Sequence, residues 1–98
     1  MSKDIHITSI PYNEQIGAFF KKQRKACGLK QIDLATKLGF KSPQFVSNVE
    51  RGLCAYSPGH LAIVTELCKI NEDELVAILL KNYENYLRKK LAGTDPEN

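Results

Sequence analysis

The sequence predicts an all-α fold of five helices in which the last helix is unusually long. Apolar residues recur at intervals of three and four along five successive segments, which is the spacing of one helix face. Serine, asparagine and proline mark the starts of several segments, and glycine marks several ends. The chain has 98 residues, 43% of them hydrophobic, which suffices for one modest core and leaves little room for a second domain.

The first helix is expected from about Asn13 to Ala26. Asn13 is a suitable N-cap because its side-chain oxygen can accept a hydrogen bond from the first helical turn. Ile16, Phe19 and Phe20 lie roughly on one side of this helix, and lysines occupy the other. The apolar side is therefore expected to enter the core.

Two short helices joined by a tight turn are expected over about residues 31–51. The first ends at Gly39, a residue type that tolerates the left-handed conformation at a helix end. The second is expected to begin with Ser42 as its N-cap and Pro43 at the first helical position. It ends at Gly52. Short polar and basic side chains on the second helix are left pointing outward.

Two further helices complete the predicted fold. The fourth runs from its N-cap, Ser57, to about Lys69. The fifth covers about residues 72–91, with Asn71 as its cap and acidic residues in its first turn, where they suit the positive end of the helix dipole.

The fifth helix carries more apolar residues than the core requires. Leu75 and Leu79 suffice to close the core, whereas four apolar residues further along are surplus. These four residues are Leu80, Tyr83, Leu87 and Leu91. A second copy of the chain could cover them, which predicts a homodimer through this helix. The alternative is a longer core helix that folds back on its own domain.

The predicted domain covers residues 12–91, between an extended or disordered arm (1–11) and a frayed tail (92–98). No stretch approaches the roughly 18 apolar residues of a membrane span, and the N-terminus has no signal-peptide pattern. The three cysteines are odd in number and far apart, which argues against a metal cluster or a disulfide framework. A reducing cytoplasm fits this pattern best.

Basic charge gathers around the central helix pair. The net charge of the whole chain is only +3, but residues 19–51 contain eight lysines and arginines and two acidic residues, so the local balance is 8 − 2 = +6. Such a cluster suits a nucleic-acid phosphate backbone. The alternative is a solvated basic face.

Several short motifs occur in a fixed order along the chain. They are Gly28-Leu29-Lys30-Gln31, Leu34-Ala35, Lys37-Leu38-Gly39, Val46-Ser47 and Val49-Glu50-Arg51-Gly52. This ordered set, within about residues 16–79, resembles the Cro/repressor-type (XRE-like) helix-turn-helix family of bacterial and phage transcription regulators. The resemblance implies a lambda-repressor-like DNA-binding domain of five helices.

Two departures from the family pattern stand out. Lys30 replaces the usual Ser or Thr, so the first helix of the motif lacks its usual cap, at a cost of about 1 kcal/mol. The turn before Gln44 is also one residue longer than in the commonest members of the family. The family pattern therefore does not specify which residue at the tip of the second helix points at DNA.

The resemblance places the second helix of the pair, about residues 43–51, in the DNA major groove. The residues expected to read bases are Pro43, Gln44, Ser47 and Asn48. Of these, Gln44 and Asn48 carry amides that can contact adenine with two hydrogen bonds. The residues expected to bind phosphate are Gln31, Lys41, Ser42 and Arg51. The resemblance also implies a structural ion pair between Arg24 and Glu50; the alternative is two exposed charges of no consequence.

The predicted function is sequence-specific DNA binding by a transcriptional regulator that acts as a dimer on an inverted repeat. Scattered histidines, no clustered carboxylates outside the helix cap and no phosphate loop indicate no catalytic site, and no metal or cofactor is expected. The alternatives are an antitoxin-type autoregulator and a protein-docking module. A docking module should carry apolar or aromatic anchors where this chain has Gln44, Ser47 and Asn48.

Overall fold

The computed structural model describes residues 10–93, and within that range it contains five α-helices and no β-strand. The helices are α1 (Glu14–Ala26), α2 (Gln31–Lys37), α3 (Gln44–Glu50), α4 (Pro58–Leu67) and α5 (Glu72–Leu91). The predicted all-α fold with a long last helix is therefore confirmed. The predicted arm (1–11) and tail (92–98) lie almost wholly outside the described residues.

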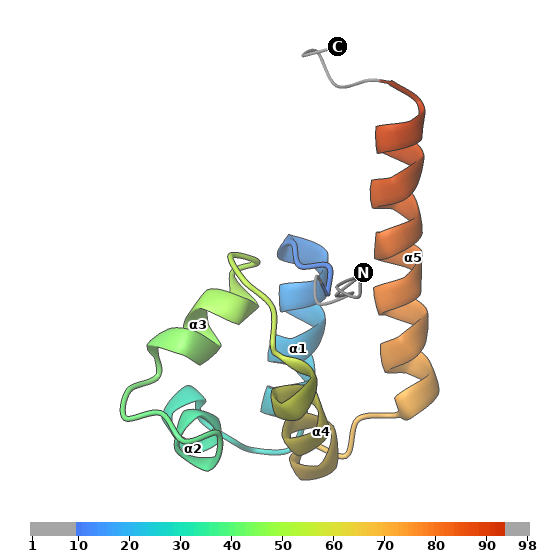
Figure 1. The fold of residues 1–98 in the computed structure, drawn as a ribbon. Coiled ribbons are helices and arrows are strands. Elements are labelled where there is room, and N and C mark those ends of the chain that lie inside the picture. Colours follow the sequence, from blue (N-terminus) through green and yellow to red (C-terminus); the bar gives the residue numbers. More distant parts are fainter. Residues whose placement is uncertain (1–9, 94–98) are drawn as a thin grey trace, which may run out of the picture.

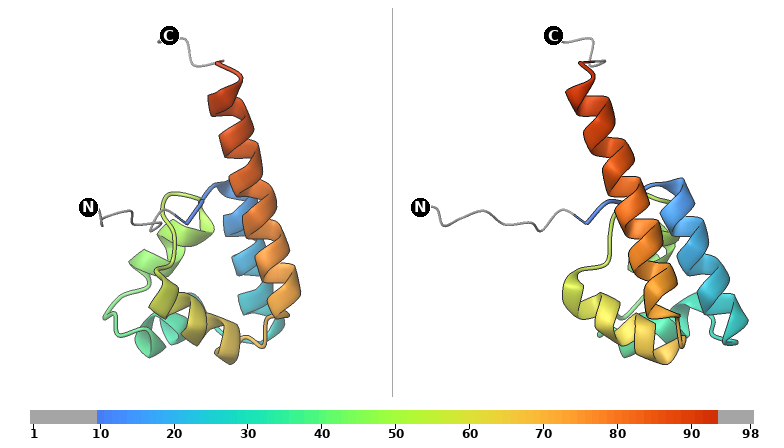
Figure 2. Two further views of the ribbon diagram at one scale, coloured as in Figure 1. Left: turned by 45° about the vertical axis from the view of Figure 1, so that its right-hand side comes forward. Right: turned by 90° about the vertical axis from the view of Figure 1, so that its right-hand side faces the viewer.

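Helix α5 borders one side of the fold and extends past the other helices. Figure 1 shows α1 in the centre, with α2 and α3 on one side of it and α5 on the other. The first half of α5 runs beside α1, whereas the second half projects beyond the other four helices, as the further views also show (Figure 2). The alternative of a last helix folded back on its own domain is therefore wrong.

One apolar core holds the helices together. Its buried members are Ile16, Phe20, Leu34, Ala35, Val46, Val49, Tyr56, Val64, Cys68, Ile70 and Leu75. Tyr56 packs edge-to-face on Phe20, with ring centroids 5.0 Å apart. Burial raises the pKa of the Cys68 thiol to about 12, so this side chain stays protonated and packs as a small apolar group.

The predicted N-caps of three helices are confirmed. The Asn13 side chain accepts a hydrogen bond of 2.9 Å from the backbone N–H of Ile16 in α1. The Ser57 hydroxyl caps α4 by accepting a hydrogen bond of 3.1 Å from the backbone N–H of His60. The Asn71 side chain caps α5 by accepting a hydrogen bond of 2.9 Å from the backbone N–H of Glu74. Each cap satisfies a backbone donor that has no partner inside its own helix.

Two helix boundaries differ from the prediction. The N-cap of α3 is Pro43 rather than Ser42, because Pro43 has a ψ of 0° and does not take the full helical conformation. The Ser42 hydroxyl still accepts a hydrogen bond from the Gln44 N–H, at 3.3 Å. Helix α4 ends at Leu67 rather than Lys69, because Lys69 is left-handed, with a φ of 51°.

Gly17 allows α1 to lie directly against the end of α3. A Cβ atom at Gly17 would collide with the Glu50 carbonyl oxygen and would lie 2.6 Å from the Val49 carbonyl oxygen. Only a residue without a side chain fits this crossing. Gly17 therefore helps to fix the position of α3 on the body of the domain, and the helical pattern of the sequence did not reveal it.

Candidate nucleic-acid interface

Helix α3 and its C-cap, Arg51, present a row of polar side chains on the outer side of the helix. Gln44 and Arg51 are exposed, and Ser47 and Asn48 are half-buried between them. The opposite face of α3 is apolar, and Val46 and Val49 enter the core. The helical phase therefore separates a packing face from an outward face, as the sequence predicts.

Polar residues of α3 and its C-cap, Arg51, form a hydrogen-bonded network centred on one oxygen. The Gln44 side-chain amide donates to Asn48 Oδ1 at 2.9 Å. The Arg51 guanidinium donates to the same oxygen at 2.6 Å. The residues stand four and three positions apart, which places them on one side of the helix. The sequence analysis missed this network, although the spacing alone would have indicated it.

The network has a chemical consequence for base recognition. A carbonyl oxygen has two lone pairs, and the two donors engage both lone pairs of Asn48 Oδ1. A bidentate contact to adenine needs this oxygen as an acceptor and the amide nitrogen as a donor. Asn48 can therefore contact a base in this way only after Gln44 or Arg51 releases its oxygen.

A buried ion pair joins α1 to the end of α3. Arg24 Nε donates to Glu50 Oε2 at 2.6 Å, and Arg24 Nη2 donates to Glu50 Oε1 at 3.0 Å. The side chains are only 7% and 3% exposed. The hydrogen bond with Glu50 raises the pKa of Arg24, against the opposing effect of burial. A third donor, Nη1, reaches the Leu29 carbonyl oxygen at 2.7 Å.

Gln31 extends this pair into α2. Its side-chain amide donates to Glu50 Oε1 at 2.9 Å, so the one carboxylate of α3 is held from both α1 and α2. One of the two amide hydrogens of Gln31 is thus used inside the protein. The second hydrogen and the backbone N–H at the start of α2 remain for an external acceptor such as a phosphate.

The connection between α2 and α3 brings three further predicted residues to the surface. Lys41, Ser42 and Pro43 are all exposed there. The ring of Phe40 stacks on Phe45, with centroids 4.7 Å apart, which fixes the connection to the apolar side of α3. The turn is thus packed on α3 through Phe40 while its polar side chains face solvent.

The start of α2 has one half of a capping box, without a capping side chain at the N-cap. Lys30 makes no side-chain capping bond, as its chemistry requires. The Asp33 carboxylate instead accepts a hydrogen bond of 2.9 Å from the Lys30 backbone N–H. The acidic side chain also suits the positive end of the helix.

The four residues predicted for dimerisation are exposed along α5. Leu80 is 62% exposed, Tyr83 38%, Leu87 39% and Leu91 84%. No other segment of the described chain carries so long an exposed apolar row. The apolar surface that the sequence predicts to be surplus is therefore present on the described structure.

Asn82 is a buried polar residue that the sequence analysis missed. Its Oδ1 accepts a hydrogen bond of 2.8 Å from the Asn13 side-chain amide, and its own amide donates to the Ile78 carbonyl oxygen at 2.8 Å. It lies seven positions after Leu75, on the face that packs on the domain. A polar residue at that helical phase was the available signal.

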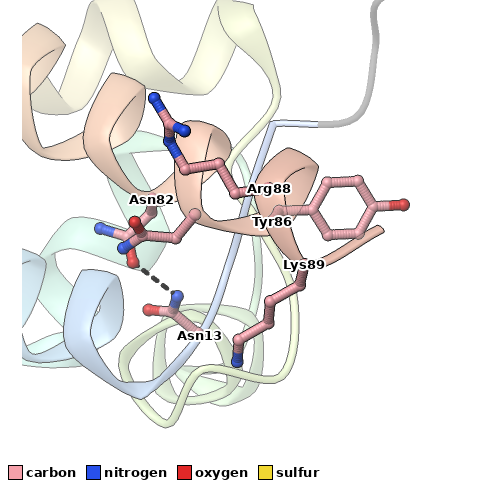
Figure 3. Close-up of a pocket in the computed structure, with 6 residues that line it drawn as sticks. Asn13, Asn82, Tyr86, Arg88 and Lys89 are labelled. Carbon is pink, nitrogen blue, oxygen red and sulfur yellow. Dashed lines mark hydrogen bonds between the residues drawn. The ribbon is translucent and has the colours of Figure 1, made fainter. Parts of the chain in front are cut away.

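Beside this contact lies a shallow pocket (Figure 3). It is lined by Asn13, Asn82, Asn85, Tyr86, Arg88 and Lys89. Arg88 is paired with Glu84 one turn earlier, at 2.8 Å. Over residues 10–93, no group of three or more histidines, cysteines or acids could hold a metal ion. No helix within the described part of the chain is long and apolar enough to cross a membrane.

The comparisons with known proteins agree with this geometry. A family model described as helix-turn-helix matches residues 20–75, from the middle of α1 to the start of α5. No curated protein and no solved structure matches the chain. The matched stretch covers more than half of the chain and contains the whole α2–α3 pair. The protein therefore belongs to the helix-turn-helix family of Cro/repressor-type DNA-binding regulators.

Proposed function

We propose that the protein is a sequence-specific transcriptional regulator that binds an inverted-repeat operator as a homodimer, with α3 in the major groove. The observation that carries this proposal is the outward face of α3. Short polar side chains there stand on a helix that is held from behind by the Arg24–Glu50 ion pair and by Gln31. A rigid helix with short amide and hydroxyl side chains suits the reading of base edges.

Base reading is assigned to Gln44 and Asn48, with Pro43 and Ser47 beside them. Phosphate binding is assigned to Gln31, Lys41, Ser42 and Arg51, which lie at the helix ends and in the turn. If Arg51 turns to a phosphate, it releases Asn48 Oδ1 for an adenine amino group. Phosphate binding and base reading are thereby coupled through one hydrogen bond.

The proposed dimer explains why the chain carries an exposed apolar row on α5. One helix-turn-helix reads only a few base pairs, so a second copy on a two-fold axis doubles the contacts. The two α3 helices must then lie about 34 Å apart, or a multiple of this distance, to enter successive major grooves on one side of the DNA. The α5 contact is proposed to set that distance.

The alternatives are less well supported by the described surface. A docking module would present apolar or aromatic anchors on α3, where Gln44, Ser47 and Asn48 stand instead. An antitoxin-type autoregulator would use the α5 row to hold a different protein. We also propose that the protein is cytoplasmic, that it is of bacterial or phage origin, and that it has no enzymatic activity.

Selection of bound sequences from a random duplex pool tests the proposed function. Wild-type protein should enrich an inverted repeat with a fixed spacing between its half-sites. A Gln44→Ala/Asn48→Ala variant should retain the spacing and lose preference at positions within each half-site. An Asn85→Ala variant, altered away from α3, is the matched control and should enrich the wild-type sequence. An unenriched pool after several rounds with the wild type would refute specific DNA binding.

A further inference from the structure

The exposed apolar row of α5 is longer than the four residues predicted from sequence. Val76, in the first half of the helix, is also exposed and stands four positions before Leu80. The full row consists of Val76, Leu80, Tyr83, Leu87 and Leu91. At 3.6 residues per turn, these five side chains fall within an arc of about 80°. We call them the α5 stripe.

The stripe faces away from the domain along its whole length. Leu75 and Asn82, on the opposite side of α5, are the two buried residues of this helix. The hydrogen bond between Asn82 and Asn13 fixes the rotation of α5 on α1. In Figures 1 and 2, nothing from the other helices covers the outer side of α5. The stripe is therefore accessible from Val76 to Leu91.

We propose that two copies pair their α5 helices antiparallel, with the two-fold axis beside Tyr83. This inference rests on the proposed homodimer and specifies its geometry. The stripe has nearly the same spacing when read from either end, because Val76 and Leu91 are equally distant from its centre, as are Leu80 and Leu87. In an antiparallel pair each residue therefore meets an apolar residue of the second copy.

The charges at the two ends of α5 favour a second copy in this orientation. The first turn contains Glu72, Asp73 and Glu74, and the last turn contains Arg88, Lys89 and Lys90. An antiparallel partner brings an acidic first turn close to a basic last turn at both ends of the contact, and it also opposes the two helix dipoles. A parallel partner would bring together like charges.

The arrangement also explains the length of α5. The half that projects beyond one domain covers the first half of α5 in the other copy. The two domains then lie on opposite sides of the helix pair, because each packs on the face of its α5 that lies away from the stripe. The core needs only the first half, and the second half serves the partner.

Disulfide cross-linking between single-cysteine additions tests the orientation. Val76→Cys and Leu91→Cys variants are prepared separately, mixed, oxidised with a small disulfide reagent, and compared with wild type, which has three native cysteines. Peptide mass spectrometry then identifies the linked positions. The antiparallel pair predicts a 76–91 link in the mixture that appears in neither variant alone. In that pair, two copies of position 76 lie about 22 Å apart along the helices, far beyond disulfide reach.

Each other result overturns the proposal. Links between two copies of position 76 in the single variant would show a parallel pair. No link above the wild-type background in any sample would show that the stripe does not pair. DNA binding by the same proteins is measured separately, by mobility shift on a selected operator. A parallel pair with intact binding rejects this inference alone. An absent pair with intact binding also rejects the α5 dimer of the proposed function and leaves DNA recognition by α3 standing. An antiparallel pair without any DNA binding rejects the proposed function alone.

Charge reversal supplies a second test that needs no thiol chemistry. Lys90→Glu should weaken self-association about threefold to tenfold in sedimentation, because it places an acid near the acidic first turn of the partner. Glu72→Lys added to it should restore association. A parallel pair predicts the opposite sign for the single change, since Lys90→Glu would relieve repulsion between like ends. Circular dichroism of each variant verifies that α5 remains helical.

Discussion

The side-chain amide of Asn13, the N-cap of α1, donates a hydrogen bond of 2.8 Å to the buried Oδ1 of Asn82 in α5. The same Asn13 accepts the capping bond of α1 through its own oxygen. One residue therefore both starts the first helix and fixes the rotation of the last. That rotation decides which side of α5 faces solvent, and hence where the α5 stripe points.

Replacing Asn82 should loosen this junction. Asn82→Ala leaves the Asn13 amide without its protein partner and removes a buried hydrogen bond, so we expect a loss of about 1–3 kcal/mol in the free energy of unfolding. Urea denaturation measures the change. Asn85→Ala, an exposed position on the same helix, is the matched control and should change stability by less than about 0.5 kcal/mol. Equal stabilities of the two variants would contradict the structural role of Asn82.

Breaking the buried ion pair should be more costly. Glu50→Ala leaves Arg24 buried without a counter-charge and removes the acceptor of Gln31, so we expect a loss of about 3–5 kcal/mol in the free energy of unfolding. Thermal and urea unfolding are the measurements. Glu66→Ala, at an exposed position of α4, is the control. A loss no larger than that of the control would show that the carboxylate contributes little to holding α3.

The sequence predicted the helices well because their signals are local. Caps such as Asn71 and a stop such as Gly39 act within one turn, and apolar spacing identifies the buried faces. Gly17 and Asn82 were missed because their roles depend on which helix passes close by, and periodicity carries no such information. The Arg24–Glu50 pair was expected only through the family resemblance, since a contact across 26 positions has no local signal.

Residue type predicts the polar row of the site, and the structure adds hydrogen bonds within that row. The sequence predicts Gln44, Asn48 and Arg51 as separate contacts to DNA, and the structure joins them through Asn48 Oδ1. Spacing of three and four positions would have suggested such bonds. Which of them opens on DNA depends on the ligand, and that lies beyond both the sequence and the free fold.

The Asn48 side chain should carry base preference without carrying stability. Asn48→Ala should weaken binding to the selected operator by about 1–3 kcal/mol and relax preference at one position of each half-site. Fluorescence anisotropy against single-base operator variants measures both effects. The stability in urea should stay within about 0.5 kcal/mol of wild type because the residue lies on the outer face. Full discrimination by both this variant and Gln44→Ala would refute the assignment of base reading.

Lys41 should act through charge alone. Lys41→Ala should weaken binding to operator and random DNA by similar factors and lower the slope of log affinity against log salt by about one unit per site. Lys81→Ala, which removes a lysine from α5 instead, is the control and should leave the slope unchanged. Anisotropy titrations over a range of salt concentrations give both slopes. A loss confined to the operator would show that Lys41 reads sequence rather than phosphate.

Leu87 should decide the oligomeric state. Its exposed side chain lies on the α5 stripe, so Leu87→Asp would place an unpaired carboxylate in the proposed contact twice per dimer, where burial of charge is costly. We expect a folded monomer in sedimentation at micromolar concentration, with operator binding weakened at least tenfold. Asn85→Asp introduces the same charge on the other side of α5 and should remain dimeric. If wild type itself sediments as a single species of monomer mass, with and without operator DNA, the two-fold mechanism is wrong, and α3 must find its site as a single copy.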